Sequence, residues 1–353
     1  MNFSSNDTDD MLSETVRRFA TEELRPKLRE FEARRSVARD VQERFESLGL
    51  AAIDLPEALG GVGLGLSSRV LVNRILAEAD AGAALALDRF GPAAYVIETF
   101  GGSDLLERYR DLLASRPETR LALLIDVDAG TVLEGPVRGE AAWIASGNAD
   151  VLVCLRRDGA WVMESGFELE QARGAALHAT GASRIRYGGA PAHVWRDSTL
   201  AAQAWAKVRL YHAALIWGVL VDAAGFSRRY ALERVAFGKP IAHHQALAFL
   251  IVDMEIAVER VGLLIADAAR LIDAGMDGTG AAASAFVDAV EASRFVGPNA
   301  VQILGGHGFM RDYPVEKAMR DSRALGLLAG GTDAAQDDAG AALAPANPME
   351  FAA

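Results

Sequence analysis

The residues that could do chemistry gather at two glycine-bearing turns. The first reads "ERVAFGKP" (233–240) and places Arg234 shortly before a Phe–Gly pair. A guanidinium suits a diphosphate because its planar fork matches phosphate oxygens. The second reads "GGHGF" (305–309), where the imidazole of His307 could act as a base. Taken alone, such an arginine is more often a solvated charge and such a glycine turn a helix C-cap, so neither turn identifies a function.

Charge excludes several classes of partner. The 353-residue chain has a net charge of −12 and a pI near 5.1, which argues against non-specific binding to nucleic acid or to an anionic membrane. The N-terminus lacks the basic start and apolar core of a signal peptide. No apolar run of about 18 residues is present, so we expect no membrane span.

The single cysteine sets the expected compartment. Cys154 cannot form an intramolecular disulfide, which suits a reducing cytoplasm, and one cysteine disfavours a structural zinc site. Cys154 lies in the apolar run "ADVLVCL". We predict a buried strand residue there and a cytoplasmic protein.

Hydrophobic patterning divides the chain into a mainly α protein with a small β domain. We predict an N-terminal helical domain (1–118), a middle antiparallel β domain (119–197), a C-terminal helical bundle (198–340) and a loose Ala/Pro-rich tail (341–353). Six short apolar runs punctuated by Gly, Asn and Asp predict the strands. Three long apolar helical patterns predict the bundle, with Gly275 ending the second of them.

The N-terminal region carries local helix signals. Leu12, Val16, Phe19, Ala20 and Leu24 recur at spacings of three and four, which predicts a buried helix face. The segment "DVQERFESLGL" (40–50) opens with an acidic pair resembling a capping box, Asp40 and Glu43. The loop "PEALGGVGLGLSS" (56–68) follows no clear strand, so we interpret it as a connection rather than a phosphate cradle.

Three stretches together resemble the acyl-CoA dehydrogenase family. The segment 228–247, "RRYALERVAFGKPIAHHQAL", is similar to its Tyr-Ala-x-x-Arg-x-x-Phe-Gly-x-Pro-Ile segment. The segment 301–321, "VQILGGHGFMRDYPVEKAMRD", is similar to its Gln-x-x-Gly-Gly-x-Gly segment. The segment 56–65, "PEALGGVGLG", is similar to its N-terminal loop. The resemblance implies helices, a β domain and a four-helix bundle, assembled as a tetramer with FAD bound across a subunit interface.

The resemblance also implies a reaction. In this family a glutamate removes the α proton of an acyl-CoA thioester while the β hydrogen leaves as hydride to the flavin. The α proton is weakly acidic, so the chemistry needs hydrogen bonds to the thioester carbonyl and a poised base. The implied substrate is therefore an acyl-CoA thioester and the implied cofactor is FAD.

Residues of the family's arm toward a neighbouring subunit are kept. Arg234 matches the arginine that reaches the neighbour's FAD pyrophosphate, and Phe237 completes that turn. Gln302 and Gly306 match residues that touch the adenosine end of the same FAD. At the position of His307 the family has an aromatic residue, which favours packing over catalysis for this side chain.

Residues of the chain's own site are lost. Gly330 stands at the position of the base, or Ala329 if the alignment slips by one, and the alternative base position on the first bundle helix holds Val208. Ile125, Thr131 and Ala145 replace residues near flavin and substrate; Thr332 survives, but Ala334 follows it where the family contacts adenine.

Three interpretations remain open. The first is a base-deficient half-site subunit that pairs with a complete paralogue, resembling the short subunits of α2β2 dehydrogenases of bulky steroid side-chain CoA thioesters. The second is a homotetramer or homodimer with a relocated base, for which the candidates are Asp333 and, more weakly, Asp253 or Glu255. The third is a member of the fold with non-dehydrogenase chemistry or no catalysis.

Overall fold

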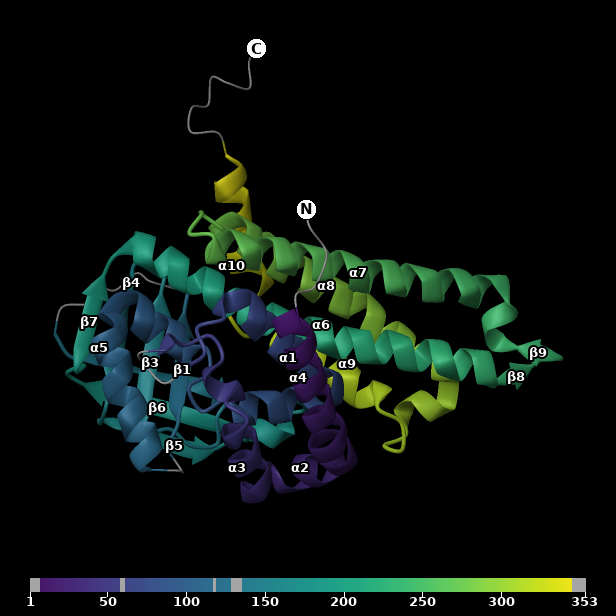
Figure 1. The fold of residues 1–353 in the computed structure, drawn as a ribbon, viewed down its shortest axis with the longest axis horizontal. Helices are drawn as coiled ribbons and strands as arrows, with labels where there is room; N and C mark the ends of the chain where they lie inside the picture. Colours follow the sequence, from purple (N-terminus) through teal and green to yellow (C-terminus); the bar gives the residue numbers. More distant parts are fainter. Residues whose placement is uncertain (1–6, 58–60, 117–118, 128–134, 345–353) are drawn as a thin grey trace, which may run out of the picture.

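A computed structural model describes residues 7–57, 61–116, 119–127 and 135–344. Figure 1 shows helices packed beside a β domain, with a long bundle that extends away from it. The N-terminal helices are α1 (Asp7–Phe19), α2 (Leu28–Arg34), α3 (Arg39–Ser47), α4 (Gly65–Leu87) and α5 (Ala93–Ser115). A π-helical turn (Ala20–Leu24) and 3₁₀ turns (Arg25–Lys27, Leu50–Ala52) connect them.

The predicted apolar face of the first helices is confirmed, because all five of its residues are buried. The predicted capping box is wrong. Helix α3 begins at Arg39, one residue before Asp40, and its N-cap residue Ala38 makes no side-chain cap. Glu43 instead forms an ion pair with Arg39 at 2.8 Å, because their spacing of four residues places the two side chains on one face of the helix.

The connecting loop predicted over 56–68 ends earlier, because α4 begins at Gly65; residues 58–60 of that loop lie outside the described part of the chain. Helix α4 is capped from a distant element. Asp273 accepts hydrogen bonds from the backbone N–H groups of Leu66 (2.8 Å) and Ser67 (2.9 Å). A carboxylate there satisfies two donors that the first helical turn leaves open.

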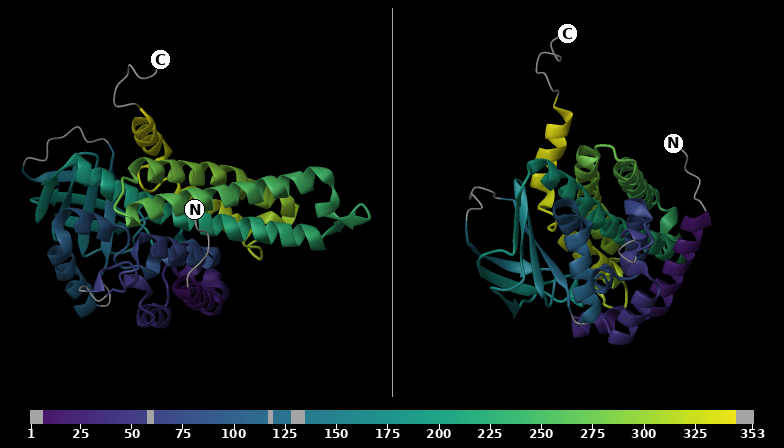
Figure 2. Two further views of the ribbon diagram at one scale, coloured as in Figure 1. Left: turned by 45° about the horizontal axis from the view of Figure 1, so that its top comes forward. Right: turned by 60° about the vertical axis from the view of Figure 1, so that its left-hand side comes forward.

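The β domain holds two sheets, seen edge-on in the right-hand view of Figure 2. One has the strand order β1-β3-β4-β7 and the other β2-β6-β5. The prediction of a purely antiparallel domain is wrong, since β1 pairs with β3 in parallel. The sequence analysis also missed β5. The strands are β1 (Leu121–Asp126), β2 (Val137–Ile144), β3 (Val151–Arg156), β4 (Gly159–Met163), β5 (Phe167–Gln171), β6 (Ser183–Gly189) and β7 (His193–Arg196).

Cys154 on β3 is fully buried. The predicted buried strand cysteine is therefore confirmed. Burial raises the pKa of its thiol well above the usual value, which disfavours the reactive thiolate.

The C-terminal bundle is built around α6. It contains α6 (Ser198–Glu233), α7 (Gln245–Asp273), α8 (Thr279–Leu304), α9 (Val315–Leu325) and α10 (Gly331–Leu343). A short hairpin, β8 (Val235–Ala236) and β9 (Lys239–Pro240), follows α6 at the far tip of the bundle in Figure 1. Gly218 lets α6 approach α4, because a Cβ there would lie 2.1 Å from the carbonyl oxygen of Arg74.

By length and composition α6 alone among the described helices could cross a membrane, but 72% of its apolar window is buried inside the fold, as for a core helix. The predicted loose tail begins too early, since α10 runs to Leu343. Residues 345–353 of that predicted tail lie outside the described chain. Gly275, with φ of 69°, follows the last turn of α7 as predicted.

Candidate active site

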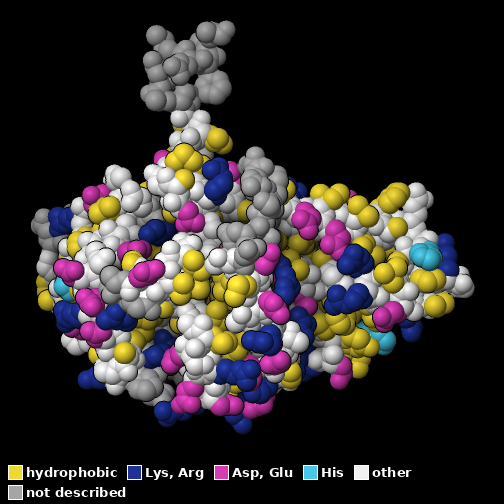
Figure 3. All heavy atoms as spheres, viewed as in Figure 1, with side chains coloured by type: hydrophobic (Ala, Val, Ile, Leu, Met, Phe, Trp, Pro, Cys, Tyr) yellow, Lys and Arg dark blue, Asp and Glu magenta, His cyan; other side chains and the backbone are white. Residues whose placement is uncertain are grey.

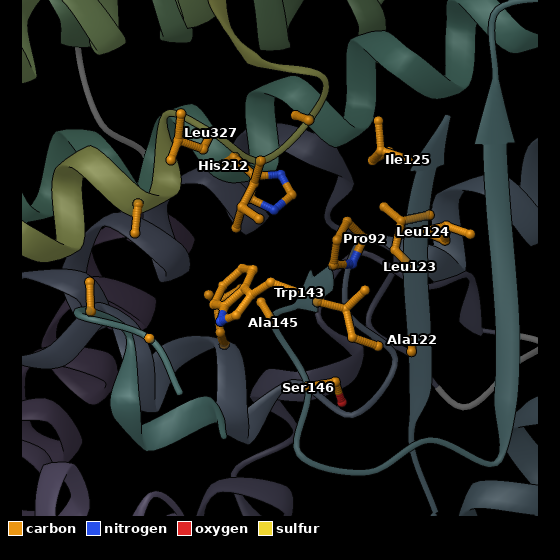
Figure 4. A pocket seen from close by; sticks show the side chains of 18 of the residues that line it. Pro92, Ala122, Leu123, Leu124, Ile125, Trp143, Ala145, Ser146, His212 and Leu327 are labelled. Carbon is orange, nitrogen blue, oxygen red and sulfur yellow. The ribbon is translucent and has the colours of Figure 1, made fainter. Parts of the chain in front are cut away.

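A cavity of about 960 Å³ lies where the β domain meets the helices. Strands β1 and β2, the start of α5, helix α6 and the segment between α9 and α10 enclose it (Figure 4). Most of the labelled side chains are apolar. The cavity brings together three positions that the resemblance assigned to the chain's own flavin and base, namely Ile125, Ala145 and Gly330.

Gly330 sits at the point where α10 begins, and its φ of 83° is a left-handed conformation. A Cβ built there would come within 2.9 Å of Cζ3 and Cη2 of Trp205 and within 3.1 Å of Cγ1 of Val127. Both the backbone and its surroundings therefore favour glycine. The preceding residue, Ala329, is buried and also has a positive φ, of 51°.

Trp205 is held firmly in this place. Its indole Nε1 donates a hydrogen bond to the carbonyl oxygen of Arg156 at 3.0 Å. The guanidinium of Arg209 lies 4.9 Å from its ring centroid and also pairs with Asp338 of α10 at 2.6 Å. These contacts connect α6, β3 and α10 around the ring, so Trp205 occupies the space beside Gly330 that a side chain would need.

The other candidate base positions bring no carboxylate to the cavity. Val208 is fully buried in α6. Asp333 is exposed in the first turn of α10 and is not among the described lining residues. On α7, Glu255 faces Arg228 at 3.4 Å and Asp253 is exposed. The relocated carboxylate thus stays a prediction for which this geometry gives no support.

His212 is a cavity residue that the sequence analysis missed. It lies one turn after Val208 on α6, is 4% exposed, and lines the cavity. Its ring nitrogen Nδ1 donates to the carbonyl oxygen of Val208 at 2.8 Å. Burial lowers the pKa of His212 to about 4, so the imidazole is neutral at pH 7. No pattern in the sequence distinguished it from the other residues of this long helix; the cavity does.

A buried polar network supports the cavity floor. Asp88 accepts hydrogen bonds from the backbone of Gly91 (2.8 Å) and from the hydroxyl of Tyr211 (3.0 Å). Arg69 pairs with Asp54 at 2.7 Å and lies 3.8 Å from Asp88. The two carboxylates raise the pKa of Arg69 despite its burial. This network holds the loop between α4 and α5 in place, and its charged groups are paired with one another.

The residues predicted to hold a cofactor fall at two ends of the molecule. Arg234 and Phe237 are exposed at the hairpin that follows α6, and the side chain of Phe237 is 96% exposed with φ of 53°. Gln302 and Gly306 are exposed at the nearby end of α8. Thr332 is buried beside the cavity end, where Arg294 donates to its hydroxyl at 3.4 Å.

His307 packs against aromatic rings. Its Nδ1 lies 2.8 Å from the hydroxyl of Tyr230, and its ring stacks on Tyr313 with centroids 5.1 Å apart. The contact with Tyr230 joins the α8 end to the last turn of α6. These contacts agree with the packing role that the sequence analysis favoured.

Comparison with known proteins assigns the family. Residues 6–116 match the acyl-CoA dehydrogenase N-terminal domain, and residues 199–343 match the acyl-CoA dehydrogenase C-terminal domain. An acryloyl-CoA reductase (NADH) of Anaerotignum propionicum is 27% identical, over 94% of this chain and 93% of that protein. A cyclohex-1-ene-1-carbonyl-CoA dehydrogenase of Geobacter metallireducens is 28% identical, over 89% and 92%.

Solved structures agree on the fold. Butyryl-CoA dehydrogenase from Megasphaera elsdenii superposes with a TM-score of 0.84 at 23% identity, covering 97% of this chain and all of that one. The predicted fold of helices, small β domain and helical bundle is therefore confirmed. With both terminal domains matched and the fold shared throughout, this chain belongs to the acyl-CoA dehydrogenase family, and its cofactor is FAD.

Proposed function

We propose that this chain is the base-deficient subunit of an acyl-CoA dehydrogenase complex and that it works by completing the FAD site of a partner subunit. The observation that carries the proposal is the packing of Trp205 against Gly330. A base position that had merely lost its side chain would leave a gap. Here a buried tryptophan with two separate contacts fills the space, which supports a fold adapted to the absence of the carboxylate.

The position of the arm supports a role toward a neighbour. The hairpin with Arg234 and Phe237 lies at the tip of the bundle, and the β domain with the cavity lies at the opposite end (Figure 1). An exposed Arg234 at that distance cannot serve its own cavity. Its guanidinium suits the diphosphate of a dinucleotide held by another chain.

The bundle surface supports an assembly. Helix α7 exposes Phe249 (60%), Val252 (53%), Ile256 (56%) and Leu263 (54%), which recur along one side. Hydrophobic side chains along this part of the molecule are visible at the right of Figure 3. An apolar stripe of this length marks a protein interface. The expected partner is a paralogue with a glutamate at the base position, or a second copy of this chain.

The residues present fit FAD on the arm better than in the cavity. On the arm, Arg234 forms no ion pair with any described residue, and a Cβ at Gly306 would meet no described atom within 4 Å, so a ligand can approach both. In the cavity, Ile125 and Ala145 offer the flavin ring no hydroxyl. FAD, when bound, accepts the hydride of the dehydrogenation. This chain's residues would orient the cofactor and exclude water, while the proton acceptor would come from the partner.

The substrate of the complex is proposed to be an acyl-CoA thioester with a bulky acyl group. The size of the cavity and its apolar lining support this class. The name of one relative, cyclohex-1-ene-1-carbonyl-CoA dehydrogenase, indicates that a cyclic acyl group is accepted by that protein. The more specific proposal of a steroid side chain as the acyl group is based on the resemblance of this chain to the short, base-lacking subunits of steroid-specific dehydrogenases.

The test is the FAD content of the purified protein. The chain is expressed alone and together with a dehydrogenase paralogue that carries the glutamate, and FAD per chain is measured from flavin absorbance. We expect little FAD alone and one FAD per two chains in a co-purified complex. One FAD per chain in the lone protein, together with reduction by an acyl-CoA, would overturn the proposal. Circular dichroism of the lone chain checks that low FAD content does not reflect misfolding.

A further inference from the structure

Most buried polar groups of the described cavity wall are engaged within the protein, whereas the guanidinium of Arg323, which also lines the cavity, is exposed. Asp88 binds Gly91 and Tyr211, as described above. The guanidinium of Arg120 donates to the carbonyl oxygens of Leu85 (3.1 Å) and Asp88 (3.3 Å). The hydroxyl of Ser146 donates to the carbonyl of Asn148 at 2.5 Å. A ligand in the cavity therefore finds few partners among these described side chains.

Two ring nitrogens on the described wall differ from the rest. The indole Nε1 of Trp143 has no hydrogen-bond partner, but it is completely enclosed, and a Cβ on Gly174 would lie only 3.0 Å from it. The Nε2 atom of His212 is not enclosed in this way, and the only hydrogen bond described for that side chain is made by Nδ1. Of these two nitrogens, the one on His212 can meet a ligand without movement of the wall.

The tautomer of His212 follows from its helix. A carbonyl oxygen can only accept, so the bond to Val208 places the proton on Nδ1. Nε2 is then a lone-pair acceptor, and it lies on the side of the ring away from the helix backbone. Figure 4 shows the ring between Leu327 and Pro92, above Trp143. The result is an acceptor in the cavity wall for which no partner within the described protein is seen.

We propose that His212 is the specificity-determining residue of this chain's own cavity and that it accepts, at Nε2, a hydrogen bond from a hydroxyl or amide N–H of a largely apolar, uncharged ligand group. A buried acceptor without a partner is unfavourable. A ligand donor relieves that cost, whereas a purely hydrocarbon group does not. The low basicity of the imidazole supports acceptance of a hydrogen bond rather than pairing with an anion.

This inference goes beyond the proposed function. If the chain completes a partner's FAD site, its own cavity still recognises a ligand of defined chemistry, such as an acyl chain or ring that carries one hydroxyl. The cavity would then be a binding site that no longer needs a base. The assignment depends on His212 and the cavity wall alone, so it can hold or fail whether or not a partner subunit exists.

The experiment compares two probes of nearly equal shape, 2-naphthol and 2-methoxynaphthalene, of which only the first can donate. Binding is measured by calorimetry on the protein as isolated, with its FAD and any co-purifying subunit. We expect 2-naphthol to bind roughly tenfold more tightly, the range of one hydrogen bond to a buried acceptor. His212→Phe should remove that preference. The control His193→Phe, in a histidine that stacks on Trp195 outside the described cavity wall, should keep it.

A second measurement does not depend on the folding of a variant. In protein with ¹⁵N-labelled histidine, the Nε2 resonance of His212 should shift with 2-naphthol and stay in place with 2-methoxynaphthalene. Equal affinity of the wild-type protein for both probes, or an unchanged preference in His212→Phe, would overturn the assignment. So would a His212-dependent deuterium exchange at the α carbon of butyryl-CoA without any probe preference, because His212 would then be a proton acceptor.

Discussion

A Cβ atom at Gly330 would lie 2.9 Å from the indole ring of Trp205. Trp205 is 4% exposed, its indole N–H donates to the carbonyl oxygen of Arg156, and the guanidinium of Arg209 lies over its ring. The indole ring therefore leaves no room for a side chain at position 330, and only glycine there lets Trp205 keep its place. Restoring a carboxylate at position 330 consequently means moving an indole ring and changing a left-handed backbone.

We predict that Gly330→Ala lowers the free energy of unfolding by about 2–4 kcal/mol, measured by urea denaturation. The matched control is Gly331→Ala. Gly331 also has a positive φ, of 73°, but a Cβ there meets no atom within 4 Å. It should cost only about 1 kcal/mol, the backbone part of the effect. Equal losses in both variants would show that Trp205 is not the obstacle.

Glu32 makes the free energy of unfolding depend on pH in the acid range. It is 4% exposed, and Arg29 and Arg320 bind it at 2.7 Å each. Burial acts to raise the pKa of Glu32, but the two guanidinium groups outweigh it and lower the pKa to about 2. Because the pKa of Glu32 is lower in the folded protein than in the unfolded chain, its carboxylate stabilises the fold fully at pH values above the unfolded pKa, near 4.5. That stabilisation is lost as the pH falls from there through about 2.

We therefore predict that Glu32→Gln costs roughly 2 kcal/mol at pH 7 and that the difference from the wild-type protein shrinks between pH 4.5 and 2. Denaturant unfolding at several pH values measures it. Glu43→Gln breaks an exposed pair with Arg39 and should change the stability by less than about 0.5 kcal/mol at every pH. A Glu32→Gln difference that did not vary with pH would contradict the pKa argument.

The helix faces that pack into the core could be predicted from the spacing of apolar residues in the sequence. Leu12, Val16 and Phe19 fall on one helix face because a buried face repeats every three or four residues. Strand β5 was missed because it is only five residues long and none of them is buried, and because Glu168 and Glu170 give it a polar composition with low strand propensity. The parallel pairing of β1 with β3 depends on which strands meet in space, which no local pattern contains.

The site was predicted in part for the same reason. The motif order predicted Gly330 as an empty base position from the sequence alone. That Trp205, 125 positions earlier, fills the space beside it is a tertiary fact. His212 likewise reads as one more residue of a long apolar helix, and only the cavity distinguishes it from its neighbours.

The arm gives a prediction for the assembled complex. Arg234→Ala removes an exposed guanidinium that we propose contacts the partner's FAD, so the FAD content of the co-purified complex should fall at least threefold, measured by absorbance. Arg18→Ala removes an exposed arginine on α1, far along the chain from the arm, and should leave the content unchanged. Unchanged FAD in Arg234→Ala would remove the arm from the cofactor site.

The buried cation Lys317 provides a test of the scaffold around the cavity. Its Nζ lies 2.9 Å from Asp80 of α4 and also pairs with Asp321. Asp80 caps the backbone of Gly82 at 2.9 Å, and Asp321 accepts from the backbone of Leu177 at 2.7 Å. The two carboxylates raise the pKa of Lys317 despite its burial. One ammonium therefore pairs with two carboxylates that hold separate parts of the fold.

We predict that Lys317→Met lowers the free energy of unfolding by about 3–5 kcal/mol, because it leaves two buried carboxylates without a cation. Thermal and urea unfolding measure the loss. Adding Asp80→Asn should recover part of it, since an amide can still accept the backbone hydrogen bond without a charge. Lys27→Met, at a partly exposed i,i+4 pair with Glu23, should cost less than about 1 kcal/mol. A similar loss in both lysine variants would mean that the buried network contributes packing rather than charge compensation.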